Sequence, residues 1–139
     1  MTEPMSQNIT IVVYEKATLK EIEKVMKKVM RDCHKWNVPI GKRIVLDQTI
    51  APVESSYYAR TGQTDKGIHV VTFSARLFLD YQHDIDEAMR NIAAHELCHT
   101  CKDGMNHGKG WKQWVSRLNE HGYHINPKPY SKNEAPGMY

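Results

Sequence analysis

The sequence predicts an α+β fold in which one helix precedes a small, mostly antiparallel three-stranded sheet and two further helices. Apolar residues repeat at helical spacing over residues 19–36, short β-branched runs follow within residues 43–73, and helical spacing returns after residue 84. The chain has 139 residues, of which 25% are charged and 40% hydrophobic, as in soluble globular proteins. We therefore expect a single domain over residues 1–125.

The first predicted helix covers residues 19–36. Thr18 and Glu21 form a capping box with Thr18 as the N-cap. The apolar residues that follow fill one arc of the projected helix, and Asn37-Val38-Pro39 ends it because a residue before proline disfavours helical geometry. Upstream, the β-branched run Ile9–Tyr14 is interpreted as a strand or a packed arm.

Six basic residues of this helix project onto one arc, away from the apolar side. This basic stripe consists of Lys20, Lys24, Lys27, Lys28, Arg31 and Lys35. It is either a solvated face built from good helix formers or a surface that follows a phosphate backbone. The net charge of +3 permits a nucleic-acid partner without requiring one.

Three strands are predicted at Arg43–Asp47, Ser56–Arg60 and Ile68–Phe73. The segment Thr61–Gly67 has turn composition and is interpreted as a hairpin loop between the last two strands. Ser74 is placed to cap a short helical turn.

The next predicted helix carries the motif His95-Glu96-Leu97-Cys98-His99 and opens with a capping box of Asp84 and Glu87. Two histidines four residues apart project from one helix face and can bind a single metal ion. The glutamate between them can take a proton from a metal-bound water, so the motif contains two ligands and a general base. Asp103-Gly104 ends the helix, with Gly104 in the left-handed conformation, and the reversal brings His107 back toward the ligands.

His107 is the predicted third ligand, and His121 and His124 downstream are the alternatives. A last amphipathic helix follows His107 and is closed by Gly122. Residues 126–139 hold prolines and polar residues without a period and are interpreted as an extended, mobile tail.

The cysteines are interpreted as packing residues. Cys101 projects about 160° from His99 around the helix, and a thiolate near a helix C-terminus is disfavoured. Cys98 and Cys101 are interpreted as small packing residues, and Cys33 lies on the apolar face of the first predicted helix. An odd number of cysteines, a polar start and the absence of a long apolar stretch predict a cytoplasmic or nucleoid-associated protein that is neither secreted nor bound to a membrane.

The motif His95–His99, followed by His107-Gly108-Lys109-Gly110-Trp111, resembles the SprT-like metalloproteases, the Spartan-related family. In that family H-E-x-x-H is followed by a histidine, a glycine and, three residues further, an aromatic. Gly67–Ser74 is similar to the strand that precedes the motif helix, and the resemblance covers roughly Leu19 to Gly122.

The resemblance implies a zincin-like fold and a zinc endopeptidase that hydrolyses DNA-associated or DNA-crosslinked proteins. It implies Zn²⁺ bound by His95, His99 and His107, with Glu96 as the catalytic base. Many members continue into a cysteine-rich zinc ribbon, whereas no cysteine follows Gly122 here, so the basic stripe is the candidate surface for single-stranded or protein-crosslinked DNA.

Two points stay open at the level of sequence. Tyr123, His121 and Arg117 are all candidates for a donor that stabilises the oxyanion, with no basis for choosing among them. The alternative function is a non-catalytic DNA-binding or scaffolding protein whose zinc only joins the last two helices. Structural zinc sites close with four protein ligands, whereas catalytic sites keep one position open.

Overall fold

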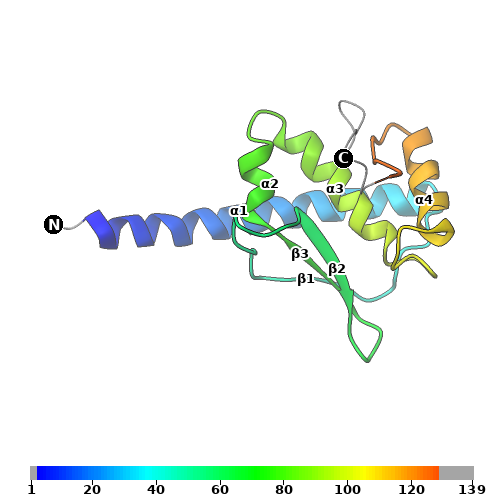
Figure 1. Ribbon diagram of the computed structural model, residues 1–139, viewed down its shortest axis with the longest axis horizontal. Helices are drawn as coiled ribbons and strands as arrows, with labels where there is room; N and C mark the ends of the chain where they lie inside the picture. Colours follow the sequence, from blue (N-terminus) through cyan, green and yellow to red (C-terminus); the bar gives the residue numbers. More distant parts are fainter. Residues whose placement is uncertain (1–2, 129–139) are drawn as a thin grey trace.

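The computed structural model describes the backbone of residues 3–128 and the side chains of residues 18–128. Its elements confirm the predicted α+β class (Figure 1). In chain order they are α1 (Glu3–Lys35), β1 (Ile44–Leu46), β2 (Ala59–Gln63), β3 (His69–Phe73), α2 (Ala75–Asp80), α3 (Ile85–Cys98) and α4 (Lys109–Glu120). In this part of the chain, no helix combines the length and apolar character that crossing a membrane needs.

Helix α1 is longer than predicted, and two predictions about its N-terminal part were wrong. Thr18 lies inside the helix and is not an N-cap, and Ile9–Tyr14 is part of the same helix and not a strand. β-Branched residues lower helix propensity by less than about 1 kcal/mol each, so a short run of them does not end a helix that continues on both sides.

The sheet is mixed, with β3 between β1 and β2. β2 pairs antiparallel with β3 over five residue pairs, and β1 pairs parallel with β3 over three. Antiparallel pairs are thus the majority, as predicted. β2 begins at Ala59 rather than Ser56, and Thr61 pairs with Val71 instead of entering the loop. The strand order β1-β3-β2 leaves β2 at an edge of the sheet.

Helix α3 is the central element, because α1, α2, α4 and β2 all pack against it (Figure 1). Ser74 caps α2 as predicted, since its hydroxyl accepts a hydrogen bond from the backbone N–H of Arg76. Asp84 occupies the N-cap of α3, although its side chain makes no capping hydrogen bond there.

The three cysteines are buried free thiols, in agreement with a packing role. Burial raises the pKa of Cys33 and of Cys101 to about 12. Neither thiol is therefore a nucleophile at neutral pH, because the thiolate is the reactive form.

After α4 the chain reverses at Gly122, whose φ of 95° suits glycine. The side chain of Asn119 then binds both the N–H and the C=O of Ile125, which holds this segment against the core. Asn126 is still buried. The predicted tail over residues 126–139 lies mostly outside the described residues and stays a prediction.

Candidate metal centre

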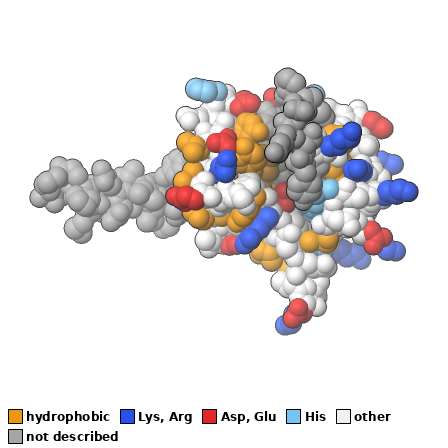
Figure 2. Space-filling view, in the orientation of Figure 1, with side chains coloured by type: hydrophobic (Ala, Val, Ile, Leu, Met, Phe, Trp, Pro, Cys, Tyr) orange, Lys and Arg blue, Asp and Glu red, His pale blue; other side chains and the backbone are white. Residues whose placement is uncertain are grey.

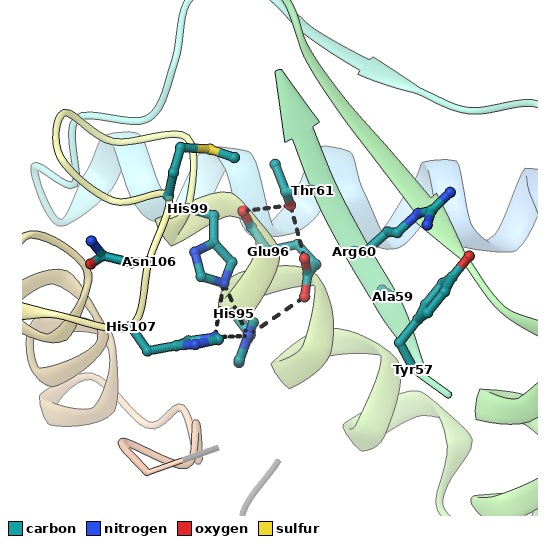
Figure 3. A pocket seen from close by; sticks show the side chains of 10 residues that line it. Tyr57, Ala59, Arg60, Thr61, His95, Glu96, His99, Asn106 and His107 are labelled. Atoms are coloured by element: carbon teal, nitrogen blue, oxygen red, sulfur yellow. Dashed lines mark hydrogen bonds and ion pairs between the residues drawn. The ribbon is translucent and has the colours of Figure 1, made fainter. Parts of the chain in front are cut away.

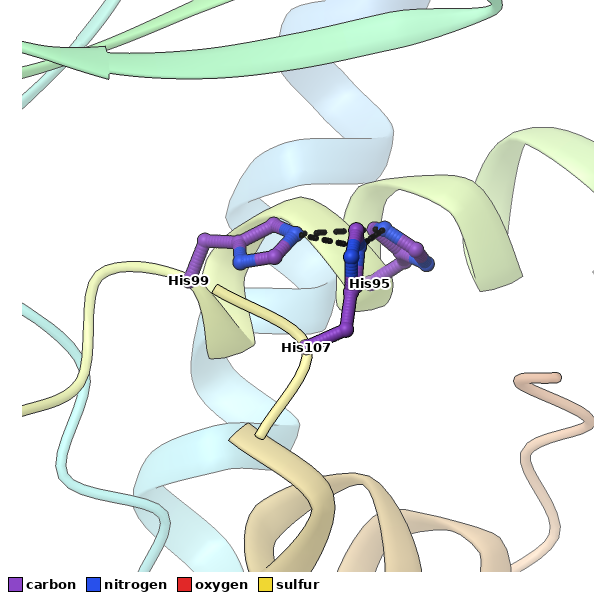
Figure 4. Close-up of side chains that lie close together, drawn as sticks. All are labelled: His95, His99 and His107. Carbon is purple, nitrogen blue, oxygen red and sulfur yellow. Dashed lines mark hydrogen bonds between the residues drawn. The ribbon is translucent and has the colours of Figure 1, made fainter. Parts of the chain in front are cut away.

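Three histidine rings converge where α3 ends and the chain turns toward α4 (Figure 4). His95 lies in the last turn of α3, His99 directly follows the helix, and His107 lies in the loop before α4. Their Nε2 atoms are separated by 3.2 Å (His95 to His99), 3.1 Å (His99 to His107) and 3.2 Å (His95 to His107). The structure thus brings together the three residues that the sequence predicted as ligands.

This triangle has the size that a tetrahedral metal site requires. Zinc bound at about 2.0–2.1 Å from each nitrogen places neighbouring ligand nitrogens about 3.3 Å apart. Among the described residues the cluster contains three side chains that offer ligand atoms, and neither His121 nor His124 belongs to it. The three histidines can therefore hold one metal ion and leave a fourth position open.

The tautomer of His99 is set by the loop that follows α3. Its Nδ1 lies 2.6 Å from the carbonyl oxygen of Gly104. A carbonyl only accepts hydrogen bonds, so Nδ1 carries the proton and Nε2 keeps its lone pair for a metal.

Gly104 was predicted to be left-handed, and this was wrong. Asp103 takes that conformation, with φ 59°. Gly104 is needed instead for close approach, because a Cβ there would lie 2.5 Å from the carbonyl oxygen of Cys98 and 2.9 Å from that of Cys101.

The electrostatics of the cluster favour neutral imidazoles. Burial lowers the pKa of all three histidines. The pKa of His95 falls well below its usual value, that of His99 falls to about 4, and that of His107 is also lowered. Repulsion from neighbouring histidines lowers the pKa of His95 and His99 further. All three rings are thus in the unprotonated form that binds metals at neutral pH.

Trp111 supports the cluster from α4. Its fully buried indole lies beside all three rings, with centroid distances of 4.9 Å to His95, 5.6 Å to His99 and 4.8 Å to His107. The indole N–H donates to the carbonyl oxygen of His95 at 3.1 Å. Trp111 therefore holds α4 and the end of α3 in one arrangement.

Glu96 lies buried beside the histidines (Figure 3). Its Oε2 is 3.6 Å from Nε2 of His95, and this contact is not an ion pair because the lowered pKa keeps His95 neutral. Burial raises the pKa of Glu96 to about 7, and a hydrogen bond from Thr61 opposes that shift. A divalent cation next to the carboxyl group would favour its ionised form.

A cavity of about 560 Å³ opens onto the histidines and Glu96 (Figure 3). Its remaining lining comes from two segments, and consists of Tyr57, Ala59, Arg60, Thr61, Met105 and Asn106. Sequence reasoning missed the first four of these, because it placed Thr61 in a loop and gave the strand no role. Ala59, Arg60 and Thr61 belong to β2, and their position beside the cavity depends on how β2 pairs with β3 and packs against α3.

The three candidates for an oxyanion donor do not line this cavity. The hydroxyl of Tyr123 donates to Asp32 at 2.6 Å, the ring of His121 stacks on Trp36, and Arg117 donates to the carbonyl oxygen of Trp36. These contacts direct all three side chains toward the end of α1.

The six residues of the basic stripe are exposed on α1. Lys27 pairs with Glu23 at 3.1 Å, and the ammonium group of Lys35 lies over the ring of Trp36. On the face shown in Figure 2, Lys and Arg side chains gather at the end of the molecule where α4 lies.

The comparison with protein families decides the assignment. A model of the SprT-like family matches residues 22–131, which is more than half of the chain. The chain belongs to the SprT-like family. No curated protein and no solved structure matches it.

Membership confirms the resemblance based on the two histidine motifs. The α+β architecture is consistent with the zincin-like fold of SprT-like proteins. The family indicates a zincin-like metallopeptidase, and this SprT-like chain has three histidines that can bind a metal ion.

Replacing Gly104 tests the support of His99. The Gly104→Ala variant should lose about 1–3 kcal/mol of unfolding free energy and bind zinc more weakly. The new Cβ would clash with the carbonyl oxygens of Cys98 and Cys101 and so shift Gly104, whose own carbonyl orients His99. Chemical denaturation and zinc titration measure the two effects. Gly62→Ala is the matched control, because a Cβ at Gly62 meets no atom within 4 Å. Equal behaviour of the two variants would contradict this role of Gly104.

The lowered histidine pKa values predict a pH dependence of the metal-free protein. Below about pH 6.5 the unfolded chain binds more protons than the folded one at these histidines, so the unfolding free energy falls as the pH decreases toward 4. Glu96, with its raised pKa, acts in the opposite sense. A comparison with His99→Gln isolates the histidine contribution.

Urea denaturation in the presence of a chelator measures this effect. Between pH 7 and pH 4.5 the unmodified protein should lose about 2 kcal/mol more than His99→Gln. The same pH dependence in both proteins would show that burial of His99 does not determine it.

Proposed function

We propose that this SprT-like chain is a zinc-dependent endopeptidase in which His95, His99 and His107 hold the ion and Glu96 is the general base. One observation carries the proposal: a buried carboxyl group and a three-histidine cluster face the same open cavity. When bound, zinc supplies a Lewis acid that acidifies water and polarises a substrate carbonyl. The donor set fits this ion, because zinc prefers neutral imidazole nitrogens in tetrahedral geometry.

Glu96 carries the proton transfers of the proposed reaction. Its Oε2 takes a proton from the attacking water and later gives a proton to the nitrogen of the leaving amine. Thr61 engages the other oxygen, Oε1, so Oε2 is the atom available near the histidines. A pKa raised toward 7 also suits a group that must both accept and donate protons.

A peptide substrate is favoured by the position of β2. The strand order β1-β3-β2 leaves β2 at the edge of the sheet, and three of its residues line the cavity (Figure 3). Backbone groups at a free strand edge can form hydrogen bonds with the backbone of an extended peptide. Such bonds hold the peptide whatever its side chains are. This arrangement supports hydrolysis within a polypeptide.

The alternative is a non-catalytic protein with a structural zinc site. A structural site normally has four protein ligands and no access for substrate. The cluster here has three ligand side chains among the described residues and opens onto a cavity. We therefore favour the catalytic function.

We further propose that the substrates are DNA-associated or DNA-crosslinked proteins and that the basic stripe contacts DNA. The stripe spans about 22 Å along α1 at 1.5 Å per residue, enough to meet several phosphates of one strand. All six side chains are exposed, and an exposed ion pair such as Lys27 with Glu23 is weak enough for the lysine to exchange the carboxylate for a phosphate.

The central test is Glu96→Gln. This variant should retain stoichiometric zinc and lose cleavage of casein or histones by at least about 100-fold, because the amide cannot accept the proton. Zinc content and cleavage should be measured with and without single-stranded DNA, and Glu87→Gln, an exposed glutamate of the same helix, is the control. Loss of zinc from Glu96→Gln would indicate that Glu96 is a metal ligand and not the base. Zinc binding without cleavage by the unmodified protein under any DNA condition would favour the structural alternative.

Removing three charges from the basic stripe tests the DNA contact. The triple variant Lys24→Gln, Lys28→Gln, Arg31→Gln should bind single-stranded DNA more weakly and reduce the slope of log affinity against log salt by about 2. Fluorescence anisotropy at several salt concentrations measures the slope.

A second triple variant with the same change in charge is the control, and consists of the exposed residues Lys42, Lys66 and Lys102 replaced by Gln. Equal slopes in the two variants would assign the DNA affinity to net charge and not to the basic stripe.

A further inference from the structure

Thr61 links the edge strand to the proposed general base. Its hydroxyl donates to Oε1 of Glu96 at 2.8 Å and also lies 3.2 Å from the backbone carbonyl oxygen of Glu96 (Figure 3). The pairing of Thr61 with Val71 fixes this part of β2 against β3. A carboxylate oxygen is the stronger acceptor, so the shorter bond is the principal one.

This bond decides which oxygen of Glu96 faces the histidines. A glutamate carboxyl group rotates easily about its last torsion, because that torsion has broad and nearly two-fold preferences. With Oε1 held by Thr61, the group stays in one orientation, and Oε2 lies 3.6 Å from Nε2 of His95.

We propose that Thr61 is a positioning residue, which fixes the carboxyl group of Glu96 so that one oxygen remains directed at the histidine cluster. The inference rests on the proposed function, because it assigns a role in that same reaction. It implies that β2 has two tasks: it borders the space for substrate and it orients the base.

Two substitutions separate the hydroxyl from the shape of the side chain. Thr61→Val keeps the β-branched form that suits a strand and removes the donor. Thr61→Ser keeps the donor and loses the methyl group. A structural role of the side chain in the strand would make Ser the more harmful change, whereas positioning of Glu96 makes Val the more harmful one.

The chain offers a matched control in Thr72 on β3. Thr72 is buried, and its hydroxyl donates to the carboxylate of Asp47 at 3.0 Å. Thr72→Val thus removes the same kind of hydrogen bond, and neither Thr72 nor Asp47 lines the cavity.

The experiment measures kcat, KM and zinc content of the unmodified protein and the three variants with casein as substrate. Thr61→Val should lower kcat about 10- to 100-fold with KM within about two-fold and zinc content unchanged, since residues that orient catalytic groups have effects of this size. Thr61→Ser should recover most of kcat, and Thr72→Val should keep it. A kcat of Thr61→Val equal to that of the unmodified protein, or a Thr61→Ser variant as poor as Thr61→Val, would overturn the inference.

Failure of the proposed function gives a different result. In that case the unmodified protein cleaves no better than Glu96→Gln, and the inference falls with it. If cleavage depends on Glu96, the proposed function stands whatever Thr61→Val does. A crystal structure of zinc-loaded Thr61→Val tests the geometry without turnover: we expect a rotated Glu96 carboxyl group, and an unchanged one would overturn the inference.

Discussion

The arrangement of the site depends on keeping three neutral imidazole rings with their Nε2 atoms within 3.2 Å of one another. Such nitrogens repel each other through their lone pairs when no proton or metal lies between them. The surrounding fold must therefore hold them in place. Gly104 fixes the ring of His99 through its carbonyl, and Trp111 packs against all three rings and binds the backbone of His95. Both contacts come from segments that follow α3 in the chain.

Burial acts on the acid–base groups of the site in two useful directions. It removes protons from the histidines by lowering their pKa values, and it raises the pKa of Glu96 to about 7. The same low-polarity surroundings thus produce neutral ligands and a carboxyl group near the neutral range. The hydrogen bond from Thr61 opposes the increase in the pKa of Glu96 and so favours the ionised carboxylate. One environment therefore favours both metal binding and the proposed proton transfer.

The sequence predicted the parts of the fold and the site that depend on local spacing. The positions of His95 and His99 follow from the helical repeat, and the return of His107 follows from a reversal between two helices. Features that depend on tertiary contacts were predicted wrongly or missed. The role of Gly104 comes from carbonyl groups that crowd it, the helical state of Ile9–Tyr14 overrides β propensity, and the contact of Thr61 with Glu96 needs the strand register.

In the proposed reaction, β2 borders the substrate and orients the base Glu96, and the mixed sheet accounts for this double role. Because β1 pairs parallel with β3 on the far side, β2 is left at the edge that borders the cavity. Side chains alternate along a strand, so Thr61 can reach α3 while the strand's backbone edge stays available to a peptide. If β2 were the central strand, its backbone would be paired on both sides and could hold no peptide. In the proposed reaction, the position of β2 thus couples the binding of a polypeptide to the orientation of Glu96.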